Sequence, residues 1–326
     1  MIKLSKIKGQ GKDMDDKKQY SIMKSRKTGS AVEHAAEFIF TACGLIAVLA
    51  VISITVYMVI NGMPTLFQVG IRDILFNSVW EPANKTDPQF GILYIILTSI
   101  IGTAFAILIG VPIGLLSAVF IAEVAPKRLA RIVKPAVELL AGIPSVIYGL
   151  LGLMILNPIM YKLELFLFQD SDTHTFTGGA NLISAVLVLA VMILPTVINI
   201  SESSLKAVPE QLKSSSLALG ASHIQTIFKV MIPAARSGII SAIVLGVGRA
   251  IGEAMAITLV SGSSVNLPLP FNSVRFLTTA IVSEMGYASG LHRQVLFTIG
   301  LVLFIFIMTI NIILSKILKK GAKEDA

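Results

Sequence analysis

Arg249 and Glu253 are the two charged residues of an otherwise uncharged stretch that runs from residue 237 to residue 274. On a helix, a spacing of four residues places the guanidinium and the carboxylate on one face. A charge at the centre of a lipid-spanning helix costs about 2.5–3.5 kcal/mol on insertion scales, so such residues face a partner or a pathway. The pair therefore predicts either a pathway lined by both side chains or a structural ion pair that neutralises both charges.

The composition indicates an integral membrane protein that is all-α. The 326-residue chain is 54% hydrophobic and 14% charged, with a mean hydropathy of +0.81, which excludes an ordinary soluble globular protein. An uncharged run of about 20 residues can cross a hydrocarbon core of about 30 Å. Six runs meet this length and predict six transmembrane helices: 38–60, 91–122, 139–161, 182–200, 237–262 and 294–315.

The basic residues predict the orientation of these spans. Of the 27 Lys and Arg residues, 21 lie in the N-terminal tail, in alternate gaps between spans and after residue 315, and only five lie in the other gaps. By the positive-inside rule, both termini are cytoplasmic. The net charge of +8 then reflects topology and not nucleic-acid binding. Residues 1–30 predict a flexible basic cytoplasmic tail, and residues 31–320 the six-helix domain.

Glycine and proline within the spans predict close packing and hinges. Proline frees a backbone carbonyl and bends a membrane helix, and a packed bundle tolerates this. Small residues four positions apart let helix backbones approach closely. The residues concerned are Gly110, Pro112, Gly114, Gly142, Pro144, Gly248 and Gly252.

The segment 201–236, between the fourth and fifth spans, predicts two short amphipathic helices joined at Gly220. Pro209 and Glu210 suit the first turn of a helix, Gly220 suits its end, and Pro233 ends the second apolar stretch. Such a knob with exposed apolar residues is typical of a docking surface. The alternative is a pair of interfacial helices that lie on the lipid.

This loop resembles the signature loop of ABC-importer permeases, in which Glu-Ala-Ala precedes a glycine and a later proline. Gly220 and Pro233 match in place, whereas Ser214 and the two serines after it replace Glu-Ala-Ala. Further motifs resemble phosphate-importer permeases of the PstC type, at residues 80–82, 90–91, 110–114, 138–149, 192–196 and 246–256.

The resemblance implies an ABC type I importer permease bundle in a bacterial plasma (inner) membrane. It implies four partners besides lipid: an ATPase dimer that binds ATP and Mg, a PstA-type second permease, an extracytoplasmic phosphate-binding protein, and phosphate itself. The loop residues that would couple to the ATPase are Ser214, Leu217, Ala218, Gly220, Ala221 and Pro233.

Phosphate gives the charged pair a chemical role. The arginine fork can bind two phosphate oxygens and stays charged in almost any environment. Glu253 can accept a hydrogen bond from phosphate, which keeps a proton at pH 7, but not from sulfate, which has none. We therefore expect Arg249 to contact phosphate in transit, while Glu253 tunes Arg249 and disfavours anions that lack a proton.

Catalysis by the chain itself is not expected, and no cofactor is predicted for it. No Gly-x-x-x-x-Gly-Lys-Ser/Thr loop occurs in the sequence, so the nucleotide would be bound by a partner chain. Asp170, Asp172 and His174 have a spacing that could touch a metal, but a Ser/Thr-rich loop favours a solvated turn and no metal site. The alternatives are a PstA-type permease, a permease for another oxyanion, an ion-coupled secondary transporter, or a scaffold without a pathway.

Overall fold

A computed structural model describes the backbone of residues 4–84, 86–171 and 173–324, and the side chains of residues 33–84, 86–171, 173–313 and 316. The described chain is almost entirely helical, and strand β1 pairs antiparallel with β2, with Trp80 opposite Phe90. The elements are α1 (Leu4–Gln68), α2 (Ile71–Leu75), β1 (Trp80–Glu81), β2 (Gln89–Phe90), α3 (Leu93–Val119), the π-helix η1 (Phe120–Val124), α4 (Lys127–Gly142), α5 (Ser145–Leu151), the π-helix η2 (Gly152–Leu156), α6 (Asn157–Leu167), α7 (Leu182–Lys206), α8 (Glu210–Ala218), α9 (His223–Thr226), the π-helix η3 (Ile227–Met231), α10 (Ile232–Ala234), α11 (Arg236–Gly252), α12 (Met255–Val260), α13 (Leu277–Glu284) and α14 (Gly290–Glu324).

The chain forms two units, Met1–Tyr57 and Met58–Ala326. The predicted tail at residues 1–30 and the predicted six-helix domain at residues 31–320 stay predictions. Helix α1 begins at Leu4 and continues across the boundary between the units. Residues 1–3 lie outside the described residues, and the flexibility predicted for the tail stays a prediction.

The helices account for the predicted spans. Within the part of the chain that the structure describes, five helices are long and apolar enough to cross a membrane: Glu33–Gln68, Leu93–Val124, Ser145–Leu167, Leu182–Lys206 and Gly290–Ile313. A sixth is possible if the bent pair His223–Ala234 and Arg236–Gly252, which meet at 71°, counts as one span. The prediction of an all-α membrane fold with six spans is confirmed to this extent.

The third span differs from the prediction of 139–161. Helix α4 ends at Gly142, and a new helix, α5, begins at Ser145. The break lies at Pro144, since proline pushes the residue before it out of the helical region, and Ile143 is accordingly extended at φ −70° and ψ 126°. The span is therefore made of α5, η2 and α6, while α4 packs against α7 as a separate helix.

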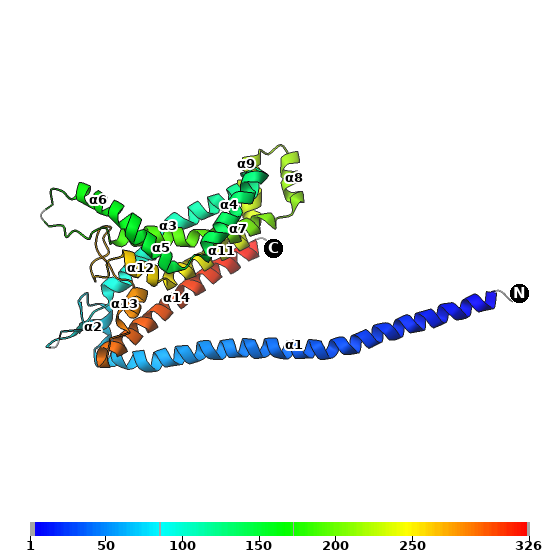
Figure 1. Cartoon of the computed structure of the whole chain (residues 1–326), viewed down its shortest axis with the longest axis horizontal. Helices are drawn as coiled ribbons and strands as arrows, with labels where there is room; N and C mark the ends of the chain where they lie inside the picture. The colour runs from blue at the N-terminus through cyan, green and yellow to red at the C-terminus, as the bar shows by residue number, and fades with distance from the viewer. Residues whose placement is uncertain (1–3, 85, 172, 325–326) are drawn as a thin grey trace. The chain divides into compact units, whose positions relative to one another are not determined.

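The core of the Met58–Ala326 unit lies where α3 packs on α7, side by side in Figure 1. Ala106, Leu189 and Ile193 are fully buried there. A Cβ added at Gly110 would lie 2.6 Å from Ile193 Cδ1, and one at Gly114 would lie 2.8 Å from Val197 Cγ1. The two helices approach this closely because both positions lack a side chain.

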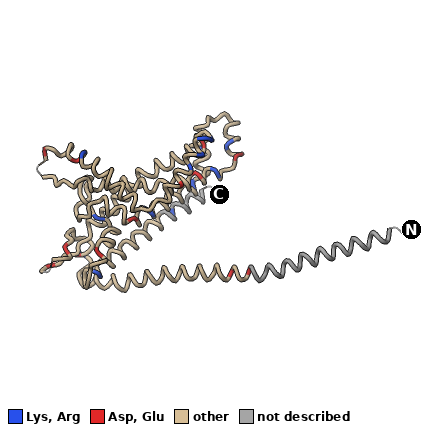
Figure 2. Tube along the Cα trace, viewed as in Figure 1, with Lys and Arg blue, Asp and Glu red and all other residues tan. Residues whose placement is uncertain are grey.

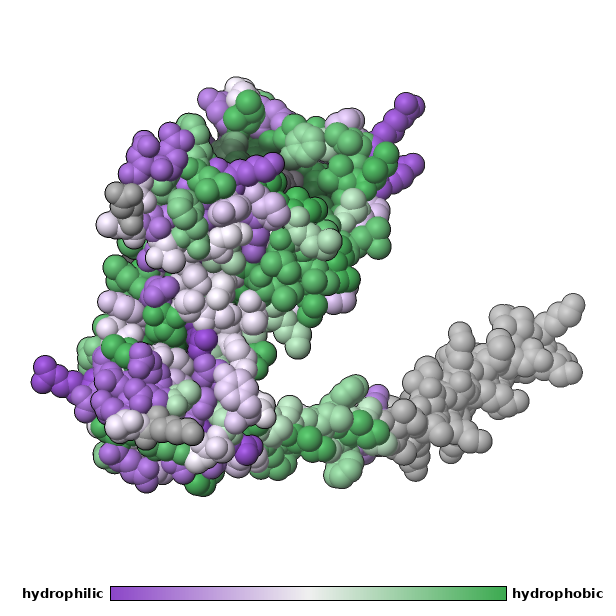
Figure 3. Space-filling view, turned by 60° about the vertical axis from the view of Figure 1, so that its left-hand side comes forward, coloured by the Kyte–Doolittle hydropathy of each residue, from purple (hydrophilic) through white to green (hydrophobic). Residues whose placement is uncertain are grey.

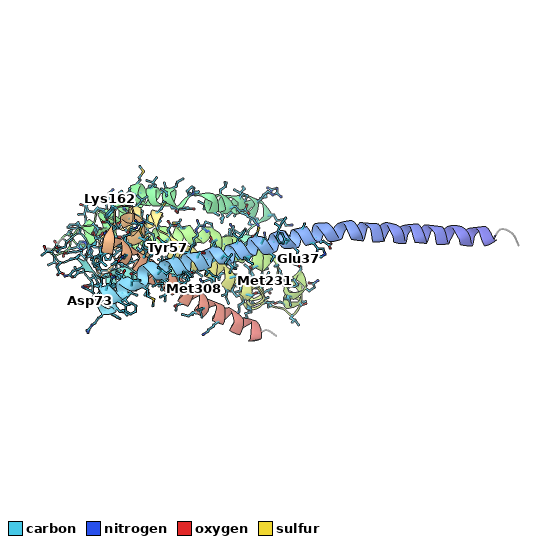
Figure 4. All side chains as sticks on the ribbon, turned by 90° about the horizontal axis from the view of Figure 1, so that it is seen from below. Glu37, Tyr57, Asp73, Lys162, Met231 and Met308 are labelled. Atoms are coloured by element: carbon cyan, nitrogen blue, oxygen red, sulfur yellow. The ribbon has the colours of Figure 1, made fainter. Side chains whose placement is uncertain are left out.

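Charged residues gather toward the two ends of this unit, and the helices between them are mostly uncharged (Figure 2). We call residues 210–234, from α8 to α10, the knob; they lie at the same end as the C-terminal part of α14 (Figure 1). Figure 4 places Met231 toward this knob end and both Asp73 and Lys162 at the opposite end. The face in Figure 3 shows broad hydrophobic areas with hydrophilic patches between them, as expected of a protein that spans lipid.

Candidate functional site: a charged helix break and two polar ends

Arg249 and Glu253 do not share one helix. Helix α11 ends at Gly252, and Glu253 has the extended dihedral angles φ −72° and ψ 132°. The chain resumes as a helix only at Met255. The predicted continuous span 237–262 is therefore interrupted between its two charged residues, and the one-face geometry that four-residue spacing predicts does not form.

Hydrogen bonds stabilise the break. The Glu253 carboxylate accepts a hydrogen bond of 3.0 Å from the backbone amide of Ala256, which satisfies a free donor in the first turn of α12. The Thr278 hydroxyl, on α13, donates a hydrogen bond of 2.6 Å to the backbone carbonyl of Glu253. Glu253 thus acts as a cap in a discontinuous helix. Sequence reasoning missed Thr278, which lies 25 residues away and carries no signal of this contact.

Arg249 is half-buried in the last turn of α11, where the negative end of the helix dipole stabilises its positive charge. No ion pair joins it to Glu253 in the described part of the chain. The positive charge of Arg249 interacts electrostatically with Tyr148 on α5. The Tyr148 hydroxyl donates a hydrogen bond of 2.7 Å to the carbonyl of Leu140.

The neighbouring glycines fall into two groups. Gly149 on α5 lies against α12, where an added Cβ would be 2.8 Å from Ala256 Cα. A Cβ at Gly248, Gly252 or Gly142 would meet no atom within 4 Å. Gly248 and Gly252 therefore form an open side of α11 in this chain, beside Arg249.

The knob has the helix–glycine–helix shape that the sequence predicts. Gly220 follows α8 with φ +87°, the left-handed conformation that glycine adopts without strain. Ser222 and Gln225 then form a capping box at the start of α9. Of the predicted coupling residues, Ala221 is half-buried, and the exposed ones are Ser214, Leu217, Ala218, Gly220 and Pro233.

Several large apolar side chains of the knob are exposed. Leu219 is 89% exposed, Ile224 70% and Phe228 53%. The hydroxyl of Ser214 donates a hydrogen bond of 3.1 Å to the carbonyl of Gln211 within α8. Ser214 thus makes a local contact within α8.

At the opposite end, a buried carboxylate contacts the loop for which the sequence predicts a solvated turn. Glu164 is fully buried; it lies 2.8 Å from His174 Nε2 and accepts hydrogen bonds from the Thr177 amide and hydroxyl. No group of three potential metal ligands occurs among the described residues, and Asp172 lies outside them. His174 also lines a cavity of about 840 Å³ between the loops at 168–180 and 262–273.

A second buried carboxylate joins four segments at the same end. Glu284, at the end of α13, accepts hydrogen bonds from Trp80 Nε1 at 3.2 Å and from Arg275 Nη1, and its other oxygen lies 2.7 Å from His292 Nε2. Arg275 also donates to the carbonyl of Ser263 at 2.7 Å. The cluster ties β1, the loop before α13 and the start of α14 together.

The chain belongs to the family of binding-protein-dependent transport system inner membrane components, whose sequence profile matches residues 110–323. It is a permease subunit of an ABC importer. It is 36% identical to the probable ABC transporter permease protein YqgH of Bacillus subtilis, over 90% of this chain and 95% of that protein.

Phosphate transport system permease proteins PstC are also relatives. The protein of Haemophilus influenzae is 33% identical over 84% of this chain and 89% of its own length, and that of Pasteurella multocida is 35% identical over 75% and 78%. The resemblance drawn from the sequence motifs is thereby confirmed. Among solved structures, an inward-facing MetNI methionine ABC transporter matches with a TM-score of 0.49 at 20% identity, over 71% of this chain and 94% of that chain.

Proposed function

We propose that this chain is the PstC-type permease subunit of an importer that moves inorganic phosphate into the cytoplasm, driven by a separate ATPase. The observation that carries the proposal is the similarity to PstC permeases over most of the chain. A separate ATPase is required because the sequence has no phosphate-binding loop for a nucleotide. ATP and Mg would then bind to the partner chains.

The charge distribution supports a cytoplasmic knob. The basic groups at residues 127–134, 206–236 and 316–323 flank the ends of helices on the knob side, and the positive-inside rule assigns such groups to the cytoplasm. Both termini would then be cytoplasmic. The opposite end, with its two polar loops, would face an extracytoplasmic phosphate-binding protein.

The exposed apolar surface of the knob supports docking of the ATPase. An apolar patch rimmed by polar residues marks an interaction site, and Leu219 at the tip is almost fully exposed. The open glycine side of α11 supports contact with a second, PstA-type permease, because small residues let membrane helices approach closely.

The break between Arg249 and Glu253 supports a phosphate pathway. Discontinuous helices in membrane proteins occur where the backbone is buried in protein or lines a cavity. Arg249 is half-buried and has no carboxylate partner at Glu253, so its guanidinium can bind phosphate oxygens. Glu253 uses one oxygen as a cap; its other oxygen can accept the phosphate proton. A transit site of this kind binds weakly enough to release the ion.

The proposal is tested by reconstituting the chain with its ATPase, second permease and binding protein in vesicles. We expect ATP-dependent uptake of labelled phosphate that excess sulfate does not inhibit, and loss of uptake in Arg249→Ala. Uptake of sulfate in place of phosphate would assign the chain to another oxyanion. Uptake driven by an ion gradient without ATP would assign it to the secondary transporters.

The docking surface is tested by co-purification of the ATPase with Leu219→Asp. This change adds a charge at an exposed position and leaves the φ of Gly220 untouched, whereas a substitution at Gly220 would strain the backbone. We expect Leu219→Asp to lose the ATPase and Leu219→Ala to retain most of it. Full retention by Leu219→Asp would contradict docking at the knob.

A further inference from the structure

Lys213 on α8 forms an ion pair with Glu123 in η1. Lys213 Nζ donates a hydrogen bond of 2.6 Å to Glu123 Oε2, and the two side chains are 22% and 7% exposed. The pair is 90 residues apart in sequence. Its short distance and partial burial distinguish it from a solvated surface pair, which contributes little.

The two residues belong to parts of the chain with different roles. Glu123 lies in the π-helix that ends the second span, continuous with α3, and π-helical turns occur often at functional sites. Helix α3 in turn packs on α7 and α11, and α11 carries Arg249. A displacement of Glu123 therefore acts on the helices around the proposed pathway.

Helix α8 is weakly attached by other means. It buries no residue, and its Ser216 hydroxyl bonds to Thr226 at 3.0 Å, which keeps that contact inside the knob. The attraction of Glu123, together with that of Glu210 one turn earlier, raises the pKa of Lys213 above its ordinary value of 10.5. Lys213 is thus charged at neutral pH.

We propose that the Lys213–Glu123 pair carries the movement of α8, in the ATPase-docked knob, to the second span. It does so alongside the apolar cluster that Ile227 and Met231 of η3 share with Val119. Lys213 and Glu123 are then positioning residues for transport, and the inference rests on the proposed function. Rigid elements linked by packed side chains and ion pairs carry energetic coupling between sites.

A second ion-pair cluster at the same end provides a structural comparison. Glu202 on α7 is buried and binds Lys134 of α4 at 3.0 Å and Lys206 at 2.5 Å. This cluster holds α4 on α7 and does not include α8. Loss of the Glu202 cluster would therefore reduce stability alone, whereas loss of the Lys213–Glu123 pair would also reduce the coupling of transport to ATP hydrolysis.

The test is a double-mutant cycle in the complete reconstituted importer. ATP hydrolysis stimulated by the binding protein and phosphate uptake per ATP are measured for Lys213→Met, Glu123→Gln and the double variant. We expect each single variant to keep the ATPase subunit bound and to lose about tenfold in both measurements, the size of one charge-assisted hydrogen bond. The double variant should lose no more than either single one, because both changes remove the same interaction.

Two further variants serve as controls. Lys213→Arg keeps the charge and should retain most of the coupling. Lys127→Met removes an exposed lysine at the start of α4, outside the knob, and should behave as wild type. Wild-type uptake per ATP and wild-type ATP hydrolysis in Lys213→Met would contradict the proposed coupling role of the pair. Losses that multiply in the double variant would contradict it as well. Loss of the ATPase subunit from Lys213→Met would also overturn it, in favour of a docking role.

The wild-type complex separates this inference from the proposed function. If it takes up no phosphate but hydrolyses ATP when the binding protein is added, the proposed substrate fails. The double-mutant cycle is then measured by ATP hydrolysis alone, and the results that support or contradict the role of the Lys213–Glu123 pair stay the same.

Discussion

The hydroxyl of Thr278 donates a hydrogen bond of 2.6 Å to the backbone carbonyl of Glu253, and this contact holds open the break between α11 and α12. Without it, this half-buried carbonyl would lose its hydrogen-bond partner, and a fully buried group left unpaired in this way costs about 1–3 kcal/mol. The contact changes the interpretation of Arg249 and Glu253. They flank a discontinuity in the helix and do not form an ion pair along one face.

Glu253 has two separable roles, as a cap and as a charge. Glu253→Gln keeps a side-chain oxygen that can accept from the Ala256 amide, whereas Glu253→Ala removes the acceptor. We predict that Glu253→Ala lowers the stability of the purified chain by about 1 kcal/mol, as for other lost caps, and that Glu253→Gln does not. Thermal unfolding in detergent measures this.

Phosphate uptake by the same two variants separates the charge from the cap. If the carboxylate charge serves selectivity, Glu253→Gln should bind and pass sulfate more readily than the wild type although its stability is unchanged. Equal phosphate preference in Glu253→Gln and wild type would limit Glu253 to its capping role.

Gly110 and Gly248 predict opposite responses to alanine. At Gly110 the new methyl group would press on Ile193 and on the carbonyl of Ala190, and overpacking of this kind costs about 1–3 kcal/mol. At Gly248 it would meet no atom, and the higher helix propensity of alanine adds up to about 1 kcal/mol. Unfolding of the isolated subunit should show the contrast, and equal effects would refute it.

Glu284 is the anchor of the end opposite the knob. Glu284→Ala leaves Arg275 and His292 without their carboxylate, and removal of one partner of a buried ion pair costs about 3–5 kcal/mol. We predict a large drop in the unfolding temperature, and Glu81→Gln, an exposed carboxylate in the adjacent strand, serves as control. A drop of the same size in both variants would contradict the anchoring role.

The Lys213–Glu123 pair predicts a dependence on alkaline pH. The pKa of Lys213 is raised in the folded chain by its hydrogen bond to Glu123. The stabilisation is therefore fully present below the ordinary value of 10.5 and is lost as the pH rises through the higher folded value. The difference in unfolding temperature between wild type and Lys213→Met should stay constant from neutral pH to about 10 and shrink above it.

Constancy below pH 10 is the informative part of that measurement. A difference that already shrinks between pH 7 and pH 9 would show that Lys213 is not held by Glu123 in the folded chain. Lys229→Met provides the baseline for removal of an exposed lysine from the same loop.

The sequence alone determined the class of the chain, its apolar spans and the knob. Each depends on local properties: the length of an uncharged run, the period of an amphipathic stretch, and glycine or proline at a turn. Gly220 at the turn of the knob and the run 182–200 within α7 are examples. The order and spacing of the motifs also indicate the family.

Only the tertiary structure decided how the charges are used. Four-residue spacing placed Arg249 and Glu253 on one helix face, but Thr278 and Ala256 stabilise a break that no helical period reveals. Lys213 forms a hydrogen bond to Glu123, 90 residues away in the sequence, and Trp80 forms one to Glu284, 204 residues away. Hydropathy and periodicity predict the secondary structure of a segment and which of its faces is buried, but not which distant segment it contacts. A partly buried charge is satisfied by whichever distant group the packing brings within hydrogen-bonding distance, and that depends on the whole fold.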